Sequence, residues 1–255
     1  MDNTAIHHKA ATNPVFRIAG LTAAIAGAEI LEELGRDYLA EEGAQTDISF
    51  DATEEALRLA QKNPDVPWDK CAFIASARRF YAHLLSFGGF AVHASAVVLD
   101  GKAYLFSADS GTGKSTHAAL WCEHFGKERA YILNDDKPII RKIDGRYYAY
   151  GAPWCGSSGI NVNRCAQVQG IAFIEQSTVD WIEPMLPGHA LIQLLRQSDP
   201  MVRREATDNL LTLFGLFIGQ VPIFRMGCTI GDSAVLMAHG TMSKNAGEAN
   251  CTQTA

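Results

Sequence analysis

Apolar and polar positions alternate along the first third of the chain in a way that predicts strands followed by helices. Residues 15–25 form an apolar run that predicts a strand interrupted at Gly20, and residues 47–50 predict a second strand. Asp51 opens a capping pattern ahead of a short helix. Residues 71–87 carry apolar side chains at helical spacing and predict a longer helix.

The middle of the chain holds two pairs of apolar runs, and each pair is separated by the dipeptide Asp-Gly. Asp-Gly favours the two-residue turn that joins antiparallel strands, so each pair predicts a β-hairpin. The pairs are residues 90–99 with 102–107, and residues 139–143 with 146–150. The pattern therefore predicts an α/β fold with a mixed, hairpin-rich sheet.

The last third of the chain alternates between strand and helix patterns. Buried strands are predicted at residues 168–174 and 221–228, and helices at 190–196, 199–217 and 232–238. The basic pair Arg203-Arg204 would lie near the start of the second helix, where the helix dipole disfavours cations. Pairing with a phosphate would explain the pair, although a solvated face is the preferred interpretation. Residues 241–255 predict a disordered tail.

Composition narrows the class of protein and its partners. The 255 residues suffice for one or two domains, and 47% hydrophobic with 20% charged residues is typical of a globular protein. A net charge of −6 argues against nucleic acid or an anionic membrane as partner, and the longest apolar runs are too short to span a bilayer. The six cysteines form no C-x-x-C pair and the N-terminus has no secretory pattern, which indicates a cytoplasmic protein with free thiols. They are Cys71, Cys122, Cys155, Cys165, Cys228 and Cys251.

Candidate chemistry begins directly after the first hairpin. The segment Ala-Asp-Ser-Gly-Thr-Gly-Lys-Ser is typical of a phosphate-binding loop (P-loop), with Ala108 where the general pattern has glycine. Gly111 and Gly113 can adopt positive φ and turn backbone N–H groups inward, and Ala108 fits if its φ is negative. Lys114 would reach the β- and γ-phosphates of a nucleotide, and the Ser115 hydroxyl would hold Mg²⁺. The candidate nucleotide-binding residues are Asp109, Ser110, Gly111, Thr112, Gly113, Lys114, Ser115 and Thr116.

The segments on either side of this loop support a nucleotide site. A short apolar strand precedes the loop and a helix pattern follows it, which is the order that a phosphate-binding loop requires. The common nucleotide-dependent switches and motors enter their loop from a parallel βαβ sheet. Here an antiparallel hairpin leads into the loop, which indicates a different and smaller class.

Two carboxylates follow the next strand. The run at residues 129–133 ends in Asn-Asp-Asp, so Asp135 and Asp136 lie at the end of a buried strand downstream of the loop. One would hold the metal directly or through water and the other would take a proton from an attacking hydroxyl, whereas a polar turn is the alternative. Residues 151–159 form a small-residue loop with one tryptophan, for which an acceptor pocket and a plain structural loop are equally open.

These features together resemble the catalytic domain of HPr kinase/phosphorylase and the nucleotide site of phosphoenolpyruvate carboxykinases, which share its fold. The resemblance is best over residues 88–142 and is closest to stand-alone HPr-kinase-like proteins. It implies that Asp136 is the general base toward an acceptor hydroxyl and that Asp135 is its metal- or water-bound neighbour, although these two roles could be exchanged. It also implies that His93 lies beside the carboxylates and the γ-phosphate.

The chain departs from this family at the family's second signature. That signature supplies an acidic metal ligand and an Arg-Gly loop, whereas residues 154–161 here contain no carboxylate. The resemblance therefore leaves HPr as the substrate and the phosphorylase reaction open. The chain is also short for a decarboxylating carboxykinase.

The sequence thus predicts a P-loop kinase core at residues 89–240, like the C-terminal domain of HPr kinase, with an N-terminal segment at residues 1–88 packed on it. The expected reaction transfers the γ-phosphoryl group of ATP, with Mg²⁺, to a hydroxyl, foremost Ser or Thr of a protein or peptide. A small-molecule kinase and a non-catalytic ATP-binding regulatory or scaffold protein are the alternatives. The expected catalytic residues are Asp136, Asp135, His93 and Lys114, and the expected metal ligands are Ser115 and Asp135. The acceptor and the oligomeric state, including a homo-oligomer, stay open.

Overall fold

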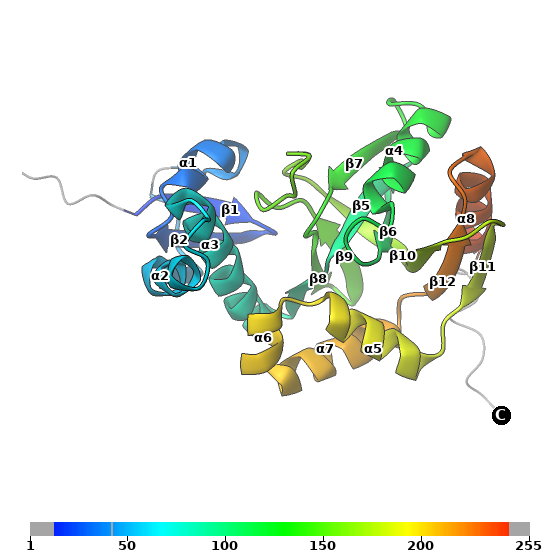
Figure 1. The fold of residues 1–255 in the computed structure, drawn as a ribbon. Coiled ribbons are helices and arrows are strands. Elements are labelled where there is room, and N and C mark those ends of the chain that lie inside the picture. The colour runs from blue at the N-terminus through cyan, green and yellow to red at the C-terminus, as the bar shows by residue number, and fades with distance from the viewer. Residues whose placement is uncertain (1–12, 42, 245–255) are drawn as a thin grey trace, which may run out of the picture.

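The N-terminal part of the chain is built on a small sheet of three strands (Figure 1). The computed structural model describes residues 13–41 and 43–244. The strands are β1 (Val15–Ile18), β2 (Leu21–Ala26) and β3 (Ile48–Asp51), in the order β1-β2-β3. The single strand expected at residues 15–25 is thus an antiparallel hairpin, because Ala19 and Gly20 both have positive φ and turn the chain back.

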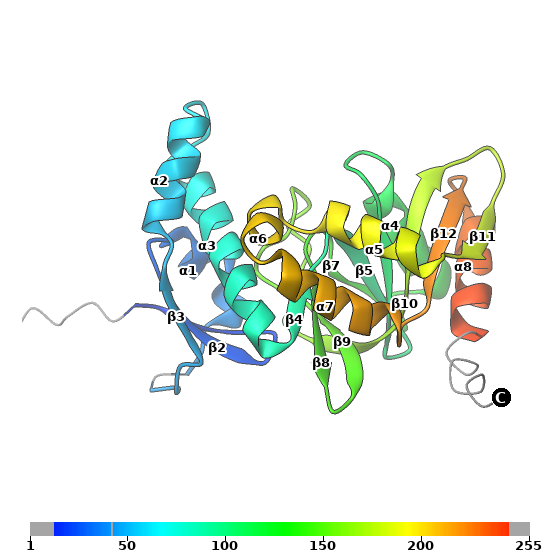
Figure 2. The ribbon, with the colours of Figure 1, turned by 90° about the horizontal axis from the view of Figure 1, so that it is seen from below.

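Three α-helices accompany this small sheet. They are α1 (Ile30–Leu34), α2 (Thr53–Lys62) and α3 (Trp68–Leu84), with 3₁₀ turns at Arg36–Tyr38 and Leu85–Phe87. The predicted helices after Asp51 and at residues 71–87 are confirmed. Helix α3 buries residues all along its length, since it packs against the small sheet at one end and continues into the rest of the molecule at the other (Figure 2).

A curled, mixed sheet of nine strands forms the larger part of the molecule. Seven strands follow the order β4-β8-β9-β10-β6-β5-β7, while β12 pairs with both β10 and β11. The strands are β4 (Gly89–Ala91), β5 (Ala94–Leu99), β6 (Lys102–Ser107), β7 (Ala130–Asn134), β8 (Ile139–Ile143), β9 (Arg146–Tyr150), β10 (Cys165–Gln176), β11 (Trp181–Pro184) and β12 (Ile223–Cys228). The short strand β11 has no counterpart among the sequence-based expectations.

Both Asp-Gly hairpins are confirmed. Strands β5 and β6 pair antiparallel through Asp100-Gly101, and β8 and β9 pair through Asp144-Gly145. All four turn residues have positive φ, which is the backbone geometry that a two-residue hairpin turn requires. Strand β6 also pairs in parallel with β10, so the strand before the glycine-rich loop lies well inside the sheet.

The apolar run at residues 90–99 is divided between two distant places in the sheet. Its first residues form β4, which pairs with β8, whereas the rest form β5 beside β6 and β7. Between them the backbone N–H of His93 donates to Gln197 O (2.9 Å), and that of Ala94 donates to Asp136 O (3.0 Å). The expected continuous strand is therefore wrong, and the break places His93 next to Asp136.

Helices cover both faces of the large sheet (Figure 2). Helices α4 (Lys114–Phe125) and α8 (Asp232–Lys244) pack on one face, and α5 (Pro187–Gln197) and α7 (Thr207–Ile218) contribute to the cluster on the other. Alternate residues of a strand therefore enter different clusters: Val97 packs toward α4, and Val98 toward the opposite side. This burial on both faces explains why the central strands are apolar throughout.

The helix expected at residues 199–217 is two helices. Helix α6 (Pro200–Glu205) ends at Ala206 and α7 begins at Thr207. Arg203 and Arg204 therefore lie in the last turn of α6, where the dipole favours cations, and the argument from an unfavourable dipole is wrong.

The C-terminal end of the described chain is helical. Helix α8 continues to Lys244, beyond the expected end at residue 238. Residues 245–255, which include Cys251 and most of the expected disordered tail, lie outside the described residues.

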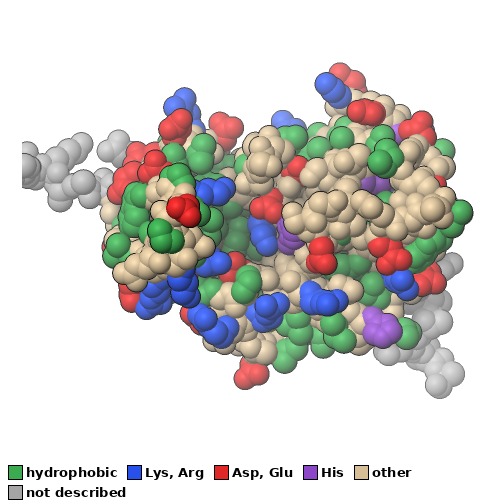
Figure 3. Space-filling model, viewed as in Figure 1, with side chains coloured by type: hydrophobic (Ala, Val, Ile, Leu, Met, Phe, Trp, Pro, Cys, Tyr) green, Lys and Arg blue, Asp and Glu red, His purple; other side chains and the backbone are tan. Residues whose placement is uncertain are grey.

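The N-terminal part contacts the loop that connects β9 to β10 of the large sheet. The ring of Trp154 is tilted against that of Phe80 and lies edge-on to that of Tyr81, both on α3. Tyr38 Oη donates to Asn161 Oδ1 at 2.8 Å. A hollow lined in part by hydrophobic side chains separates the N-terminal helices from the rest of the molecule on one face (Figure 3). The boundary near residue 88 stays a prediction. None of the helices within residues 13–244, residue 42 excepted, is long and apolar enough to cross a membrane.

Candidate active site

The glycine loop, defined here as residues 108–113, connects β6 to α4 at the edge of a cavity. Gly111 and Gly113 have φ of +80° and +114°, and both are values that L side chains rarely adopt. Ala108 is not among the described non-glycine residues with positive φ, so alanine fits the position where the general pattern has glycine. The loop therefore has the backbone geometry that its sequence predicts.

The start of α4 presents unbonded backbone donors. The hydrogen bond that opens the helix runs from His117 N to Gly113 O (2.9 Å). Among the described residues, the N–H groups of Lys114, Ser115 and Thr116 therefore have no backbone partner, as expected at a helix N-terminus. Together with the positive end of the helix dipole, these groups can bind an anion.

Lys114 lies under the glycine loop with only 7% of its surface exposed. Its Nζ donates to the carbonyl oxygens of Ala108 (2.9 Å) and Asp109 (3.2 Å). Burial lowers the pKa of Lys114 below its ordinary value, while Asp136 and Asp135 oppose that shift. Among the described residues, none of the ion pairs involves Lys114, whose Nζ bonds to two neutral carbonyl groups. A phosphate would supply the counter-charge of this buried ammonium group.

Asp135 and Asp136 follow β7 and have different surroundings. Asp135 is buried, and its Oδ1 accepts a hydrogen bond of 2.6 Å from Ser95 Oγ on β5. Asp136 is more exposed, and its Oδ1 lies 3.4 Å from His93 Nε2. One carboxylate is therefore held by the sheet, and the other is partly exposed beside His93.

Asn134 determines how the chain leaves β7. It is fully buried, and its Oδ1 accepts hydrogen bonds from the backbone N–H groups of Asp136 (3.0 Å) and Lys137 (2.7 Å). Its Nδ2 donates to Ala152 O at 3.0 Å and to Trp154 O at 3.4 Å. One amide thus positions both the carboxylate segment and the tryptophan loop, defined here as residues 151–161.

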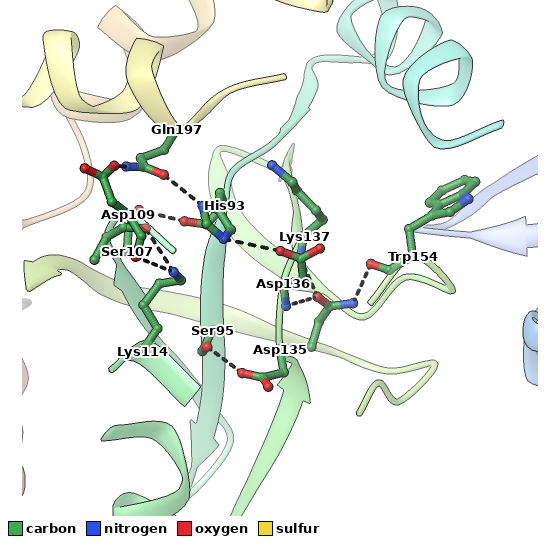
Figure 4. A network of polar contacts seen from close by, with 12 residues as sticks. His93, Ser95, Ser107, Asp109, Lys114, Asp135, Asp136, Lys137, Trp154 and Gln197 are labelled. Carbon is green, nitrogen blue, oxygen red and sulfur yellow. Dashed lines mark hydrogen bonds and ion pairs between the residues drawn. The ribbon is translucent and has the colours of Figure 1, made fainter. Parts of the chain in front are cut away.

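A chain of polar contacts joins the glycine loop to Asp136 (Figure 4). Gln197 Nε2 donates to Asp109 Oδ1 (3.0 Å), and Gln197 Oε1 lies 3.0 Å from His93 Nδ1. A carboxylate only accepts, so the amide nitrogen must face Asp109 and the amide oxygen must face His93. Nδ1 of neutral His93 therefore carries the proton, and its Nε2, which faces Asp136, carries a lone pair.

Two neighbouring cations bear on the charge state of His93. Burial, followed by Lys137 and Lys114, lowers the pKa of His93, whereas Asp136 and the Gln197 hydrogen bond oppose the shift. Burial likewise lowers the pKa of Lys137, with Asp136 opposing. The lowered pKa favours the neutral form of His93 near pH 7.

These groups line one cavity of about 510 Å³. Its walls are formed by His93, Ser110, Gly111, Gly113, Lys114, Ser115, Thr116, Asp135, Asp136, Gly156, Ser157 and Ser158. Most of the predicted site residues are therefore brought together. Asp109 connects to the cavity through Gln197, and Thr112 lines instead a neighbouring cavity of about 480 Å³.

The tryptophan loop lines the cavity with its glycine and serines rather than with its tryptophan. Trp154 is buried, and its Nε1 donates to Ser76 Oγ of α3 at 3.0 Å. Gly156 lies directly against Asp136, since a Cβ at Gly156 would be 3.3 Å from Asp136 Cβ.

Four polar residues of the site were missed by sequence reasoning, namely Ser95, Asn134, Lys137 and Gln197. Asn134 and Lys137 flank the predicted carboxylates in the sequence, and this proximity could have identified them as residues of the site. Ser95 and Gln197 had no such indication, because only the sheet pairing and the packing of α5 bring them to the site.

The donors present suit Mg²⁺ bound with a nucleotide better than a metal held by protein alone. Among the described residues, no group of three or more His, Cys, Asp or Glu side chains could hold a metal. Mg²⁺ usually takes one or two carboxylates and completes its shell with water and substrate phosphates. Asp135 and the exposed hydroxyl of Ser115, on the wall of one cavity, match that smaller donor set.

Comparison with known proteins places the chain in a family. The profile of the SynChlorMet cassette protein ScmC matches residues 58–210, which is more than half of the chain. The chain belongs to this family. No curated protein matches the sequence.

A solved structure with a related outline is the Hpr(Ser) kinase/phosphatase from Coxiella burnetii. It is 12% identical, and the match covers 61% of this chain and 94% of that chain with a TM-score of 0.32. At that TM-score the likeness is distant and carries no conclusion about function.

Proposed function

We propose that the chain is an ATP-dependent kinase that transfers the γ-phosphoryl group to the hydroxyl of Ser or Thr in a protein or peptide. The observation that carries the proposal is that the glycine loop, Lys114 and the two carboxylates line a single cavity. An anion-binding helix start, a buried cation and a pair of carboxylates are the parts that phosphoryl transfer needs.

The polyphosphate of ATP would lie along the glycine loop. The N–H groups at the start of α4 would bind its oxygens, and Lys114 would exchange its loop carbonyls for the β- and γ-phosphates. Ser115 and Asp135 would hold Mg²⁺, which when bound supplies charge neutralisation on the phosphates. These residues act by positioning and by stabilising charge, which is most of the catalysis in this reaction class.

Asp136 would accept the proton of the attacking hydroxyl. The bond between the γ-phosphorus and the bridging oxygen breaks, ADP leaves with the electron pair, and a new P–O bond forms to the acceptor oxygen. The proton goes to the carboxylate of Asp136 and can pass to His93 Nε2, which lies 3.4 Å away with a free lone pair. Gln197 fixes the tautomer of His93 that makes this transfer available.

Replacing Asp136 by Asn tests the proposal most directly. We expect Asp136→Asn to reduce transfer from γ-labelled ATP-Mg by roughly 10²- to 10⁴-fold, because the amide cannot take the hydroxyl proton. The affinity for ATP should stay close to that of the wild type. The measurement is label incorporation into polypeptides of a source-cell lysate, with calorimetry for ATP binding.

Asp144→Asn is the matched control. Asp144 is exposed in a hairpin turn with φ of +49°, a conformation that asparagine also adopts, so the same chemical change there should leave transfer unaltered. Survival of transfer in Asp136→Asn would contradict the assigned base. Label in a small metabolite would favour a small-molecule kinase, and ATP binding without any transfer would favour a regulatory protein.

A further inference from the structure

A second cavity adjoins the proposed phosphoryl-transfer site. It has a volume of about 390 Å³ and lies between the N-terminal helices α1 and α3 and the tryptophan loop. Most of its wall is apolar, and the principal contributors are Ile30, Leu34, Pro67, Phe73, Pro153 and Cys155. We call it the apolar pocket. It opens in the hollow between the N-terminal helices and the rest of the molecule (Figure 3).

The apolar pocket shares a wall with the cavity of about 510 Å³ at the proposed phosphoryl-transfer site, which we call the phosphate cavity. Gly156 and Ser157 line both of them. A Cβ at Gly156 would lie 3.3 Å from Asp136 Cβ and 3.7 Å from Asp136 Cγ, so the proposed base stands at the junction. A ligand that places a hydroxyl on Asp136 can therefore place a neighbouring group in the apolar pocket.

The remaining groups of the pocket suit a peptide. The pocket's charged residues are Asp69 and Lys70, which compensate each other, and Lys70 Nζ lies 5.6 Å from the centre of the Phe73 ring. Within the described part of the chain, the backbone N–H groups of Ser157 and Ser158 have no hydrogen-bond partner. Ser157 lines both cavities and Ser158 lines the larger one, so these donors are available to a carbonyl of a backbone bound across the shared wall.

We propose that the apolar pocket selects the acceptor: it binds an apolar side chain close in sequence to the Ser or Thr that receives the phosphoryl group. This inference rests on the proposed kinase function. It commits to a peptide because a hydroxyl in one cavity and an apolar group in the next must be connected across Gly156 and Ser157. An extended backbone, whose carbonyl groups can accept from the N–H groups of Ser157 and Ser158, makes that connection. The wall contributed by α1 and α3 gives the N-terminal part of the chain a role in recognition.

A degenerate peptide library tests this inference. Each peptide carries a central Ser or Thr with mixed residues at three positions on either side, and the library is incubated with the full chain and γ-labelled ATP-Mg. We expect enrichment of Leu, Ile, Phe or Met at one flanking position. The best peptide is then compared with a counterpart that has glycine at that position, and its kcat/KM should be about tenfold higher or more.

Two substitutions of Leu34 test whether the apolar pocket causes the preference for an apolar residue beside the acceptor. Leu34 is 51% exposed on α1, so Leu34→Lys adds a charge to the pocket wall without opening the core. It should remove the preference for the apolar-flanked peptide while transfer to the glycine counterpart and ATP affinity stay unchanged, and Leu34→Met should retain the preference. Leu236→Lys is the control, since Leu236 is 52% exposed on α8 at the opposite end of the molecule.

The possible results separate this inference from the kinase proposal. Transfer to library peptides without an apolar preference, or a preference that Leu34→Lys leaves intact, would overturn the pocket's role while the kinase proposal stands. Transfer to no peptide at all would overturn the peptide acceptor. In that last case, ATP binding measured by calorimetry decides whether the nucleotide site stands.

Discussion

The two loops that border the proposed active site are held in place by different kinds of interaction. The glycine loop is shaped mainly by local features, namely the positive φ of its two glycines and Lys114, which bonds to carbonyl oxygens five and six residues before it. Gln197 adds one distant contact, to Asp109. The tryptophan loop is held from a distance, by Asn134 at the end of β7, by Ser76 of α3 and by Tyr38 of the N-terminal part. The conformation of the glycine loop therefore depends mostly on its own residues, whereas that of the tryptophan loop depends to a larger extent on residues from other parts of the fold.

This difference suggests that the two loops have different functions, one in binding phosphate and the other in binding the acceptor. A site for phosphate requires fixed backbone donors, which a short glycine-rich segment can provide on almost any strand-to-helix connection. A site for an acceptor must suit one partner. The tryptophan loop is attached to three separate parts of the molecule, so a change in any of these parts can alter the loop's conformation. Substitutions in the two loops should therefore have different consequences, the first mainly for chemistry and the second mainly for stability.

Lys114→Met should produce the largest effect on activity. Methionine keeps the length and the apolar part of the side chain but removes the charge that would stabilise the transferring phosphoryl group. We expect the rate of label transfer from ATP to fall by roughly 10²- to 10³-fold, with weaker ATP binding. The measurement is initial-rate transfer beside calorimetric titration with ATP-Mg.

Lys127→Met serves as the control, because Lys127 is exposed just beyond α4 and the substitution removes the same charge. The melting temperature of Lys114→Met should stay near that of the wild type. Unchanged ATP affinity and transfer in Lys114→Met would show that the glycine loop does not bind a polyphosphate.

Asn134→Ala should produce the largest effect on stability. The substitution leaves the N–H groups of Asp136 and Lys137 and the carbonyl of Ala152 without their partner at a fully buried position. We expect a loss of about 3 kcal/mol in the free energy of unfolding, because buried polar groups that lose a partner are costly. Urea denaturation measures this change.

Asn134→Asp sharpens the comparison between the loops. It keeps an oxygen for the N–H groups of Asp136 and Lys137 but loses the donor to Ala152 O and Trp154 O, so it should detach the tryptophan loop selectively. Asn63→Ala is the control, since Asn63 caps α2 at an exposed position. If Asn134→Ala costs no more than Asn63→Ala, the tryptophan loop is not held through Asn134.

The contrast between local and distant interactions also explains how far the sequence alone could predict the fold. The Asp-Gly turns were recognisable because positive φ at two successive residues has a strong local preference, and the glycine loop was recognisable for the same reason. The break between β4 and β5 was not, because the apolar run continues through Val92 and the break is stabilised by Gln197 O and Asp136 O. Local preference was informative wherever the backbone geometry is determined by neighbouring residues.

The break between α6 and α7, like the break between β4 and β5, has no local signal in the sequence. No proline or glycine marks Ala206, and each helix has buried residues, such as Val202 in α6 and Leu210 in α7. The helix ends there because both segments must turn their apolar residues to the same core, which is a property of the fold. In the site, Lys114 and the carboxylates were predicted from motif and position. Gln197 reaches His93 because the end of α5 is bonded to the break between β4 and β5, where His93 N donates to Gln197 O.

Gln197 offers the mildest test, since it acts on the proposed chemistry only through His93. Gln197→Met keeps the size of the side chain but breaks the contacts to His93 Nδ1 and Asp109 Oδ1, so neither the ring orientation nor the tautomer of His93 is fixed. We expect kcat to fall about tenfold while KM for ATP stays unchanged, because the nucleotide donors at the start of α4 are not altered. Gln169→Met is a suitable control, since Gln169 is also buried but bonds only to carbonyl oxygens of α8. A rise in KM for ATP at constant kcat would instead assign Gln197 to holding the glycine loop through Asp109, and the proton path from Asp136 to His93 would then lose its support.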